Sequence, residues 1–483
     1  MTGAPPPLWT AEEAARATGG RCRGHWSASG VSIDSRTLVP GDLFVALQGF
    51  NSDGHAFVAD ALARGAAAAL VAYAPVGGAA DAPLLLVADT FAGLRALGAA
   101  ARGRSRARIA GITGSVGKTG IKEALALVLH RQAETYASVG SFNNHWGVPL
   151  SLARLPRNAA FGVFEMGMNH AGEITSLTRL VRPHVAAITT VEPAHIEHFA
   201  SVEEIADAKA EIFDGLEPGG TAVLNRDNIY CERLIGRARG AGAARIITFG
   251  RAGKADVRLI AAVGDEAGSQ IEAEVLGERL SFRIGAPGQH WQTNALCVLA
   301  CVAALSADVG AAAAALVDLR PPKGRGQRTT VRLAGGSFEL IDDSYNASPA
   351  SMRASFQVLG ASRPGPGGRR IAAVGDMLEL GPESPRLHAG LATALVENGI
   401  DLVFTAGPTS THLHEALAAP MRGAHAENSE ALAPVVAEQM RAGDVIAVKG
   451  SAGSRMRLVV EALLGLDQGR QSEQAGTAPG PGK

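Results

Sequence analysis

The stretch RIAGITGSVGKT, residues 108–119, joins an apolar run to a glycine-rich loop. The apolar residues 108–113 predict a buried strand. After the loop, apolar residues recur at helical spacing, which predicts a helix whose buried stripe carries Ile121, Leu125 and Val128. A strand, a glycine-rich loop and a helix in this order are typical of a nucleotide phosphate site in an α/β sheet.

The loop has the composition that phosphate binding requires. Glycines let the backbone approach a phosphate closely, and the N-terminus of the following helix adds partial positive charge. Lys118 would reach the β- and γ-phosphates, and Thr119 would bind Mg²⁺ through its hydroxyl. The strict pattern has glycine where Ile112 stands, so this is a shortened variant, and an ordinary strand–helix turn stays the alternative. The candidate phosphate-binding residues are Gly114, Ser115, Val116, Gly117, Lys118 and Thr119.

Strands and helices alternate on both sides of this loop. FGVFEMG (161–167) and HVAAITTV (184–191) are further buried-strand candidates, and SVEEIADAKAEIF (201–213) is a helix opening with Ser201 and Glu204 at capping-box spacing. Such alternation predicts a doubly wound, mostly parallel α/β sheet.

Changes in composition divide the chain into three domains. We expect a small mixed α/β domain at 1–105, a central nucleotide-binding domain with a P-loop ATPase-type sheet at 106–320, and a Rossmann-like domain at 321–465. ARGRSRAR (101–108) reads as a polar linker, and the Gly/Pro-rich residues 466–483 as a disordered tail. The strands expected in the third domain are FELIDD (338–343), RIAAVGD (370–376), DLVFTAG (401–407) and DVIAVKGS (444–451).

Composition excludes several classes of protein. The 483 residues include 45 Lys+Arg and 46 Asp+Glu, which gives a net charge of -1 and no electrostatic footprint for nucleic acid. No uninterrupted apolar stretch is long enough to span a membrane, and the N-terminus has no signal-peptide pattern, so we expect a cytoplasmic protein without membrane insertion. Cys297 and Cys301 could share a helix face, but two ligands make no zinc site, and we expect the four cysteines to be small buried residues.

Polar residues follow two of the predicted strands. Glu165 ends one strand, and His195 follows the next by a short loop. Ligands of parallel sheets gather at the carboxyl ends of the strands, so both should lie on the same edge as the phosphate loop. A carboxylate there suits Mg²⁺, although either residue could equally be a bystander.

Lys209 shares a helix stripe with Ile205 and Ile212, the face expected to turn inward. A lysine on such a face must snorkel to solvent, find a partner or lose its charge. Alternatively, reaction with CO₂ would convert its amine into a carbamate that binds metal like a carboxylate. Periodicity does not choose between these readings.

Further motifs point to one family. Together with the phosphate loop they resemble the Mur ligases, ATP-dependent amide-forming enzymes of peptidoglycan synthesis, over nearly the whole chain. The motifs that carry the resemblance are Asp34-Ser35-Arg36, PGDLFVAL (40–47), Asp53-Gly54-His55, SFNN (141–144), GVP (147–149), DDSYNASP (342–349), GDMLELG (375–381) and KGS (449–451).

The resemblance implies a reaction: D-Ala-D-Ala is joined to the carboxylate of UDP-MurNAc-tripeptide through an acyl phosphate, with ATP and two Mg²⁺ ions, by a monomer. It also implies roles for single residues. Lys118 and Thr119 would hold ATP and Mg²⁺, Glu165 the first metal, and His195 and carbamylated Lys209 the second. His290 and Asn294 would contact adenine, Arg325 the phosphates and Asp343 the ribose. The residues implied in substrate binding are Ser35, Arg36, Asp53, His55, Asn143, Asn144, Tyr345 and Asn346.

Three alternatives stay open at this point. A sibling Mur ligase would add a single amino acid instead. Folylpolyglutamate synthase shares the phosphate loop, but its chain starts close to that loop, whereas about 105 residues precede it here. A GTPase-like switch usually carries an Asn-Lys-x-Asp motif, which this sequence lacks.

Overall fold

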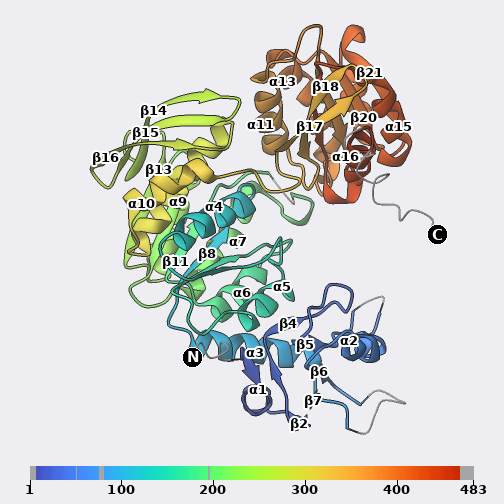
Figure 1. The fold of residues 1–483 in the computed structure, drawn as a ribbon. Coiled ribbons are helices and arrows are strands. Elements are labelled where there is room, and N and C mark those ends of the chain that lie inside the picture. The colour runs from blue at the N-terminus through green and yellow to red at the C-terminus, as the bar shows by residue number, and fades with distance from the viewer. Residues whose placement is uncertain (1–6, 50–51, 75–80, 194–195, 468–483) are drawn as a thin grey trace, which may run out of the picture.

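The computed structural model describes residues 7–49, 52–74, 81–193 and 196–467. Figure 1 shows three bodies in chain order, each built on its own sheet. We call them the N-terminal, central and C-terminal domains after the sheets of residues 21–86, 108–284 and 327–449. The expected α/β class with a doubly wound central sheet is confirmed.

The central sheet has the strand order β16-β15-β14-β13-β12-β11-β8-β10-β9. All neighbouring strands in the run from β14 to β9, which includes β8, pair in parallel. Apolar residues of α4, α9 and α10 cover one face, and those of α5 to α8 cover the other. The strands are β8 (Arg108–Thr113), β9 (Thr135–Ala137), β10 (Phe161–Glu165), β11 (Val185–Ile188), β12 (Thr221–Asn225), β13 (Arg245–Gly250), β14 (Val257–Asp265), β15 (Gly268–Val275) and β16 (Glu278–Ile284). The helices are α4 (Lys118–His130), α5 (Gly147–Ala153), α6 (Glu173–Val181), α7 (Val202–Ala210), α8 (Cys231–Gly240), α9 (Gln289–Ala304) and α10 (Val309–Ala315).

The strands and the helix expected here are present. Ser201 caps α7 by accepting a hydrogen bond from the Glu204 backbone, at 3.3 Å from Glu204 N to Ser201 Oγ. The antiparallel extension β14–β15–β16 was not predicted. Most residues of β14 from Ile260 to Asp265 are exposed, so the sequence lacks the continuous apolar pattern of the buried parallel strands.

The N-terminal domain contains a sheet of order β2-β7-β6-β5-β4 and a separate β1–β3 pair. Its strands are β1 (Trp9–Thr10), β2 (Arg21–Arg23), β3 (Ser27–Ala28), β4 (Gly30–Ser32), β5 (Asp42–Val45), β6 (Ala68–Val71) and β7 (Leu84–Leu86), and its helices are α1 (Ala11–Thr18), α2 (Val58–Ala63) and α3 (Thr90–Arg104).

The linker predicted at 101–108 is wrong. Residues 101–104 are the last turn of α3, and β8 already begins at Arg108. Arg102 is buried and donates to the carbonyls of Val181 and Arg182, each at 2.7 Å. The basic run was expected to be a polar linker, but the Arg102 guanidinium fastens α3 to the central domain, a contact that composition does not show.

The C-terminal domain has the strand order β17-β18-β22-β19-β20-β21. α11 to α14 pack on one face, and α15 and α16 on the other. The strands are β17 (Gln327–Leu333), β18 (Gly336–Asp343), β19 (Arg370–Gly375), β20 (Leu402–Ala406), β21 (Arg422–Ala426) and β22 (Val445–Lys449). The helices are α11 (Pro349–Gly360), α12 (Ser384–Ala389), α13 (Leu391–Glu397), α14 (Thr411–Ala416), α15 (Ser429–Gln439) and α16 (Arg457–Leu464).

The four strands predicted in this domain are present as β18, β19, β20 and β22, whereas the edge strands β17 and β21 were not predicted. The tail was expected to start at 466, but Asp467 is buried and accepts a hydrogen bond from Arg332. Residues 468–483 of the expected tail lie outside the described residues.

Two expectations about surface chemistry can be compared with the described part of the chain. No helix in it is long and apolar enough to cross a membrane. Cys231, Cys297 and Cys301 are buried free thiols, and Cys22 is half-buried.

Candidate active site

A cavity of about 690 Å³ lies between the central and C-terminal domains. It brings together most of the predicted site residues from both domains. Those that line it are Ser115, Val116, Gly117, Lys118, Thr119, Asn143, Glu165, Lys209, His290, Asn294, Arg325, Asp343, Tyr345 and Asn346. Gly114 and Asn144 are not among the lining residues, and neither are the four candidates of the N-terminal domain. His195 lies outside the described residues.

The phosphate loop is held in a conformation that needs its glycines. Gly114 has φ +148°, and a Cβ there would meet the Thr189 hydroxyl at 1.9 Å. Gly117 has φ +85°, the left-handed region that glycine adopts at little cost. Lys118 Nζ donates to the Gly114 carbonyl at 2.6 Å, curling back over the loop. The loop is thus shaped as an anion cradle at the start of α4.

Glu165 is the centre of a buried polar chain. The hydroxyl of Thr119 donates to Glu165 Oε2, and the side-chain amide of Asn143 donates to Oε1, both at 2.7 Å. Glu165 ends β10 beside β8, so the sheet itself places the carboxylate next to the phosphate loop. An oxygen-rich group beside a phosphate cradle matches the ligand preference of Mg²⁺.

Lys209 lies on the inward stripe of α7 that the sequence predicted. It is 2% exposed, and Ile205 and Ile212 of the same stripe are fully buried. Burial, together with the nearby charge of Lys118, lowers the pKa of Lys209 well below its usual value. Lys209 forms no hydrogen bond or ion pair with a residue that the structure describes. The snorkelling reading is therefore wrong, because the side chain is enclosed.

The C-terminal wall carries a second buried charge pair. Lys449 Nζ lies 2.9 Å from Asp343 Oδ2 and donates to the Asn346 carbonyl, also at 2.9 Å. Burial raises the pKa of Asp343, which the Lys449 ammonium partly offsets. Burial and the same ammonium lower the pKa of His290 to about 4, so its imidazole is neutral at physiological pH. A neutral imidazole can both donate and accept hydrogen bonds, as contact with a nucleobase requires.

Arg325 lies where the two domains meet. Its guanidinium carbon is 4.5 Å from the centre of the Tyr345 ring, a cation–π distance, and its Nη2 donates to Ser141 Oγ at 3.4 Å. Burial and this arginine lower the pKa of Lys118, while Glu165 opposes the change. Arg325 thus contacts both domains.

The predicted sugar-binding residues of the N-terminal domain form their own networks. His55 Nδ1 lies 2.6 Å from Asp53 Oδ1, His55 Nε2 accepts from the Ala72 backbone, and Tyr73 donates to Asp53 Oδ2 at 2.6 Å. Both ring nitrogens of His55 are therefore occupied. Arg36 is exposed and paired with Asp34, and Ser35 is buried.

Asn144 accepts hydrogen bonds from the backbone of Trp146 and Gly147 at the start of α5. Its side chain therefore stabilises a helix start, whereas its neighbour Asn143 contacts Glu165. Asn346 also stabilises the turn before α11, because its Oδ1 accepts a hydrogen bond from the Ala347 backbone. The cap of α11, however, is Ser348.

Some cavity residues escaped the sequence analysis. Glu192 and Thr189 line the cavity, and the Glu192 carbonyl and N–H both bond the Ser115 hydroxyl. They follow β11 by one to four residues, so their place after a strand was the available signal. Burial raises the pKa of Glu192.

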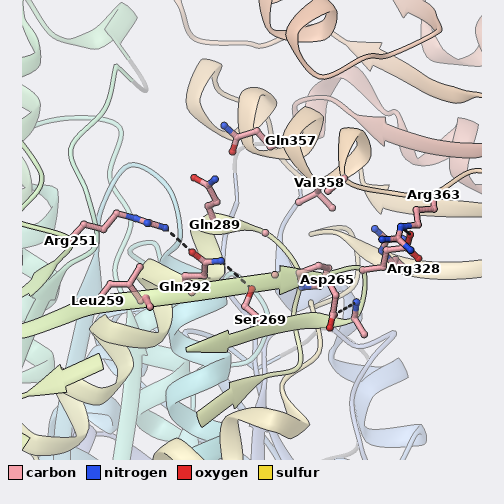
Figure 2. A pocket seen from close by; sticks show the side chains of 18 of the residues that line it. Arg251, Leu259, Asp265, Ser269, Gln289, Gln292, Arg328, Gln357, Val358 and Arg363 are labelled. Atoms are coloured by element: carbon pink, nitrogen blue, oxygen red, sulfur yellow. Dashed lines mark hydrogen bonds and ion pairs between the residues drawn. The ribbon is translucent and has the colours of Figure 1, made fainter. Parts of the chain in front are cut away.

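A second cavity of about 890 Å³ opens between the β14–β15 hairpin and α11 (Figure 2). It shares only the wall around Pro287 and Val358 with the first cavity and holds none of the predicted site residues. Three of its polar side chains bond one another: the exposed Arg251 donates to the buried Gln292, and Gln292 donates to the buried Ser269 (Figure 2). Most of the site residues predicted from the sequence therefore line the smaller cavity.

Family models match three consecutive parts of the chain. Residues 27–90 match the Mur ligase family, catalytic domain, residues 112–302 the Mur ligase middle domain, and residues 324–452 the Mur ligase, glutamate ligase domain. The UDP-N-acetylmuramoyl-tripeptide--D-alanyl-D-alanine ligase of Escherichia coli (strain K12) is 36% identical over 441 residues, covering 90% of this chain and 93% of that protein. The chain belongs to the Mur ligase family. The resemblance seen in the sequence motifs is thereby confirmed.

Solved Mur ligase structures have the same architecture. MurF from Acinetobacter baumannii matches with a TM-score of 0.80 and 29% identity, over 95% of this chain and 99% of that one. MurF from Thermotoga maritima, solved in complex with ADP, matches with a TM-score of 0.74 and 27% identity, over 91% of this chain and 98% of that one. The three-domain arrangement is thus that of the family.

Proposed function

We propose that this Mur ligase joins D-Ala-D-Ala to the terminal carboxylate of UDP-MurNAc-tripeptide at the expense of ATP, a step of peptidoglycan precursor synthesis. The relatives with this name align with nine-tenths of the chain. The observation that carries the proposal is the shared cavity, which combines the phosphate cradle and Glu165 of the central domain with Asp343 and Tyr345 of the C-terminal domain.

The residues present fit a nucleoside triphosphate. The loop at 114–119 offers backbone N–H groups and Lys118 to the phosphates, and His290 and Asn294 lie on the same cavity wall for the base. Asp343 would accept from the ribose hydroxyls. Arg325 would reach the phosphates from the C-terminal side when the domains close.

The donor set also fits Mg²⁺. Thr119 and Glu165 would hold one ion, and Lys209 as a carbamate, with His195, a second. The bound ions would supply positive charge that shields the converging phosphates and carboxylate. The buried, uncharged amine favoured at Lys209 is the form that reacts with CO₂, which supports the carbamate.

In the proposed reaction, a substrate carboxylate oxygen forms a bond to the γ-phosphorus of ATP as the bond to ADP breaks. The amine of the acceptor then attacks the acyl carbon, the C–N bond forms, and the C–O bond to phosphate breaks as the amine loses a proton. A carboxylate is a poor electrophile, so phosphorylation is what makes the amide bond accessible. The protein contributes position and charge, because Lys118 and Arg325 hold anions in line.

Tyr345 and Asn346 would select the acceptor. A dipeptide presents an amide and a distal carboxylate besides its amine, and a site built to hydrogen-bond these groups penalises a shorter acceptor. Both residues lie on the loop between β18 and α11, and they line the cavity together with Asn143. The expectations of a monomer and of a cytoplasmic location stay predictions.

An acceptor screen tests the proposal. The protein is given UDP-MurNAc-tripeptide, ATP and either D-Ala-D-Ala, D-Ala, D-Glu or meso-diaminopimelate, and the products are identified by mass spectrometry. We expect phosphate release and a product only with the dipeptide. Efficient addition of a single amino acid would replace the proposed acceptor but leave the ligase chemistry, whereas ATP hydrolysis without any acceptor dependence would contradict both.

A further inference from the structure

The 138–143 loop, between β9 and α5, connects three parts of the candidate active site. Asn143 of this loop donates to Glu165, and its carbonyl accepts from the Gly167 backbone at 2.9 Å. Ser141 accepts from Arg325 of the C-terminal side. The position of this one loop therefore sets both the surroundings of the Glu165 carboxylate and the contact between domains.

Apolar packing does not hold this loop in place. Its two large apolar side chains, Val139 and Phe142, are 57% and 38% exposed. A surface segment with few buried apolar contacts opens at low free energy unless polar bonds fix it. Such bonds come from a residue to which no catalytic role has been given so far, Lys122.

Lys122 is fully buried, with 0% exposure. Its ammonium donates to the Ser138 carbonyl at 2.6 Å and to the Gly140 carbonyl at 2.8 Å. It also lies 2.7 Å from the carboxylate of Glu123, which is itself half-exposed. A buried ammonium is costly unless it is paired and hydrogen-bonded, so these contacts fix both the lysine and the loop.

Lys122 extends from the helix that begins at the phosphate loop. It is four residues after Lys118 and three after Thr119 on α4, so the three side chains leave from neighbouring positions of the first two turns. Lys118 turns to the phosphate loop, Thr119 to Glu165, and Lys122 to the 138–143 loop. The start of α4 is therefore bonded to the phosphate loop, to Glu165 and to the 138–143 loop.

We propose that Lys122 is a positioning residue for ligation: it fastens the 138–143 loop to the phosphate-loop helix, so that nucleotide binding orders the loop that orients Glu165 and meets Arg325. The inference rests on the proposed function, because it assigns a role within that reaction. It predicts that loss of the ammonium affects the use of the tripeptide substrate and turnover more than it affects nucleotide binding, since the phosphate cradle keeps its own bonds.

Kinetics of Lys122→Met test the role in turnover. The variant keeps the length of the side chain but leaves two carbonyls without a donor. We expect kcat to fall at least tenfold and KM for UDP-MurNAc-tripeptide to rise severalfold, with the Kd for ADP, measured by calorimetry, within about twofold of the wild type. Lys122→Arg, which restores a buried cation, should recover part of kcat.

Arg102→Met is the matched control. Arg102 is also a buried cation that donates to two main-chain carbonyls, but it lies on α3, away from the cavity. The Arg102→Met variant should have a lower thermal midpoint. Its kcat, calculated per ADP-binding site, and its KM should be unchanged. If Lys122→Met also keeps the wild-type KM and the wild-type kcat per ADP-binding site, Lys122 is merely structural and the inference is wrong.

Hydrogen exchange tests the coupling without any turnover. In the wild type, ADP with Mg²⁺ should slow exchange in peptides covering 138–143, and in Lys122→Met this protection should be lost. Absence of protection in the wild type would overturn the inference even if the variant failed to fold. A wild type that shows the protection but does not join D-Ala-D-Ala would instead overturn the proposed function.

Discussion

Thr119 and Glu165, 46 positions apart in the chain, share a hydrogen bond of 2.7 Å between Thr119 Oγ1 and Glu165 Oε2. Parallel pairing of β8 with β10 places Ile112 opposite Glu165, and α4 begins shortly after β8 ends. The sheet register therefore joins the hydroxyl and the carboxylate that would share one metal ion.

Removing the charge of Glu165 should weaken metal use. Glu165→Gln keeps the shape and can still accept from Thr119, but it loses the anion that attracts Mg²⁺. We expect the Mg²⁺ concentration for half-maximal phosphate release to rise at least tenfold. An unchanged magnesium titration would show that Glu165 does not hold the ion.

Lys118→Ala should remove most of the ligation activity without unfolding the protein. The phosphates lose their charged partner, and losing one such electrostatic contact costs about 10²–10³ in kcat. The exposed Lys254→Ala serves as a control of equal charge change and should keep wild-type turnover. Circular dichroism checks the fold, and near-wild-type ligation by Lys118→Ala would contradict the assignment of the phosphate loop.

Lys209 should be carbamylated and required. Its lowered pKa leaves more neutral amine, the form that combines with CO₂, at a given pH. Lys209→Ala should be nearly inactive, and short carboxylic acids or bicarbonate should restore part of the activity by filling the vacated space. Labelled bicarbonate would reveal the carbamate by NMR. Full activity after removal of CO₂, with an unmodified lysine, would count against it.

Asn346→Ala should raise KM for D-Ala-D-Ala severalfold with little change in KM for ATP. The substitution removes the side-chain amide but keeps the carbonyl that accepts from Lys449. Asn428→Ala is the control, because Asn428 Oδ1 also accepts from a backbone N–H, at the start of α15, outside the cavity. Equal effects of the two variants on KM for D-Ala-D-Ala would show that Asn346 stabilises a turn and does not bind the acceptor.

Tyr73→Phe should reduce stability only where Asp53 is ionised. Hydrogen bonds from Tyr73 and from the His55 backbone and side chain lower the pKa of Asp53 from 3.8 to about 2. This contribution is present above pH 3.8 and is lost as the pH falls toward 2. Because the pair is exposed, the thermal midpoint should fall by at most about 2 °C at pH 7. The wild type and the variant should converge near pH 2, and a difference that persists there would have another cause.

Part of the site was predictable because parallel sheets obey a positional rule. A residue that follows a buried strand lies on the ligand-binding edge, so Glu165 could be placed from its strand pattern. Thr119 was predicted from the strand–loop–helix phosphate motif, and the role of Asp343 from the family resemblance. Helical periodicity likewise predicted the inward face of Lys209, since a 3.6-residue repeat aligns it with Ile205 and Ile212.

Other features depended on partners distant in sequence. Arg102 and Lys122 look like ordinary solvated cations in the sequence, yet both are buried because carbonyls from remote segments accept their hydrogen bonds. The edge strands β17 and β21 were also missed, since an edge strand has a weaker apolar pattern than a central one.

Residue types and local periodicity were sufficient to identify the family, the phosphate loop and the alternation of strands and helices around that loop. Three further features became apparent only in the folded protein: Lys209 is enclosed, Asn143 rather than Asn144 contacts Glu165, and Arg325 lies over Tyr345. Such pairings arise from sheet register and from the packing of two domains around one cavity. Both bring side chains into contact that are far apart in the sequence, and their separation along the chain does not indicate their distance in space.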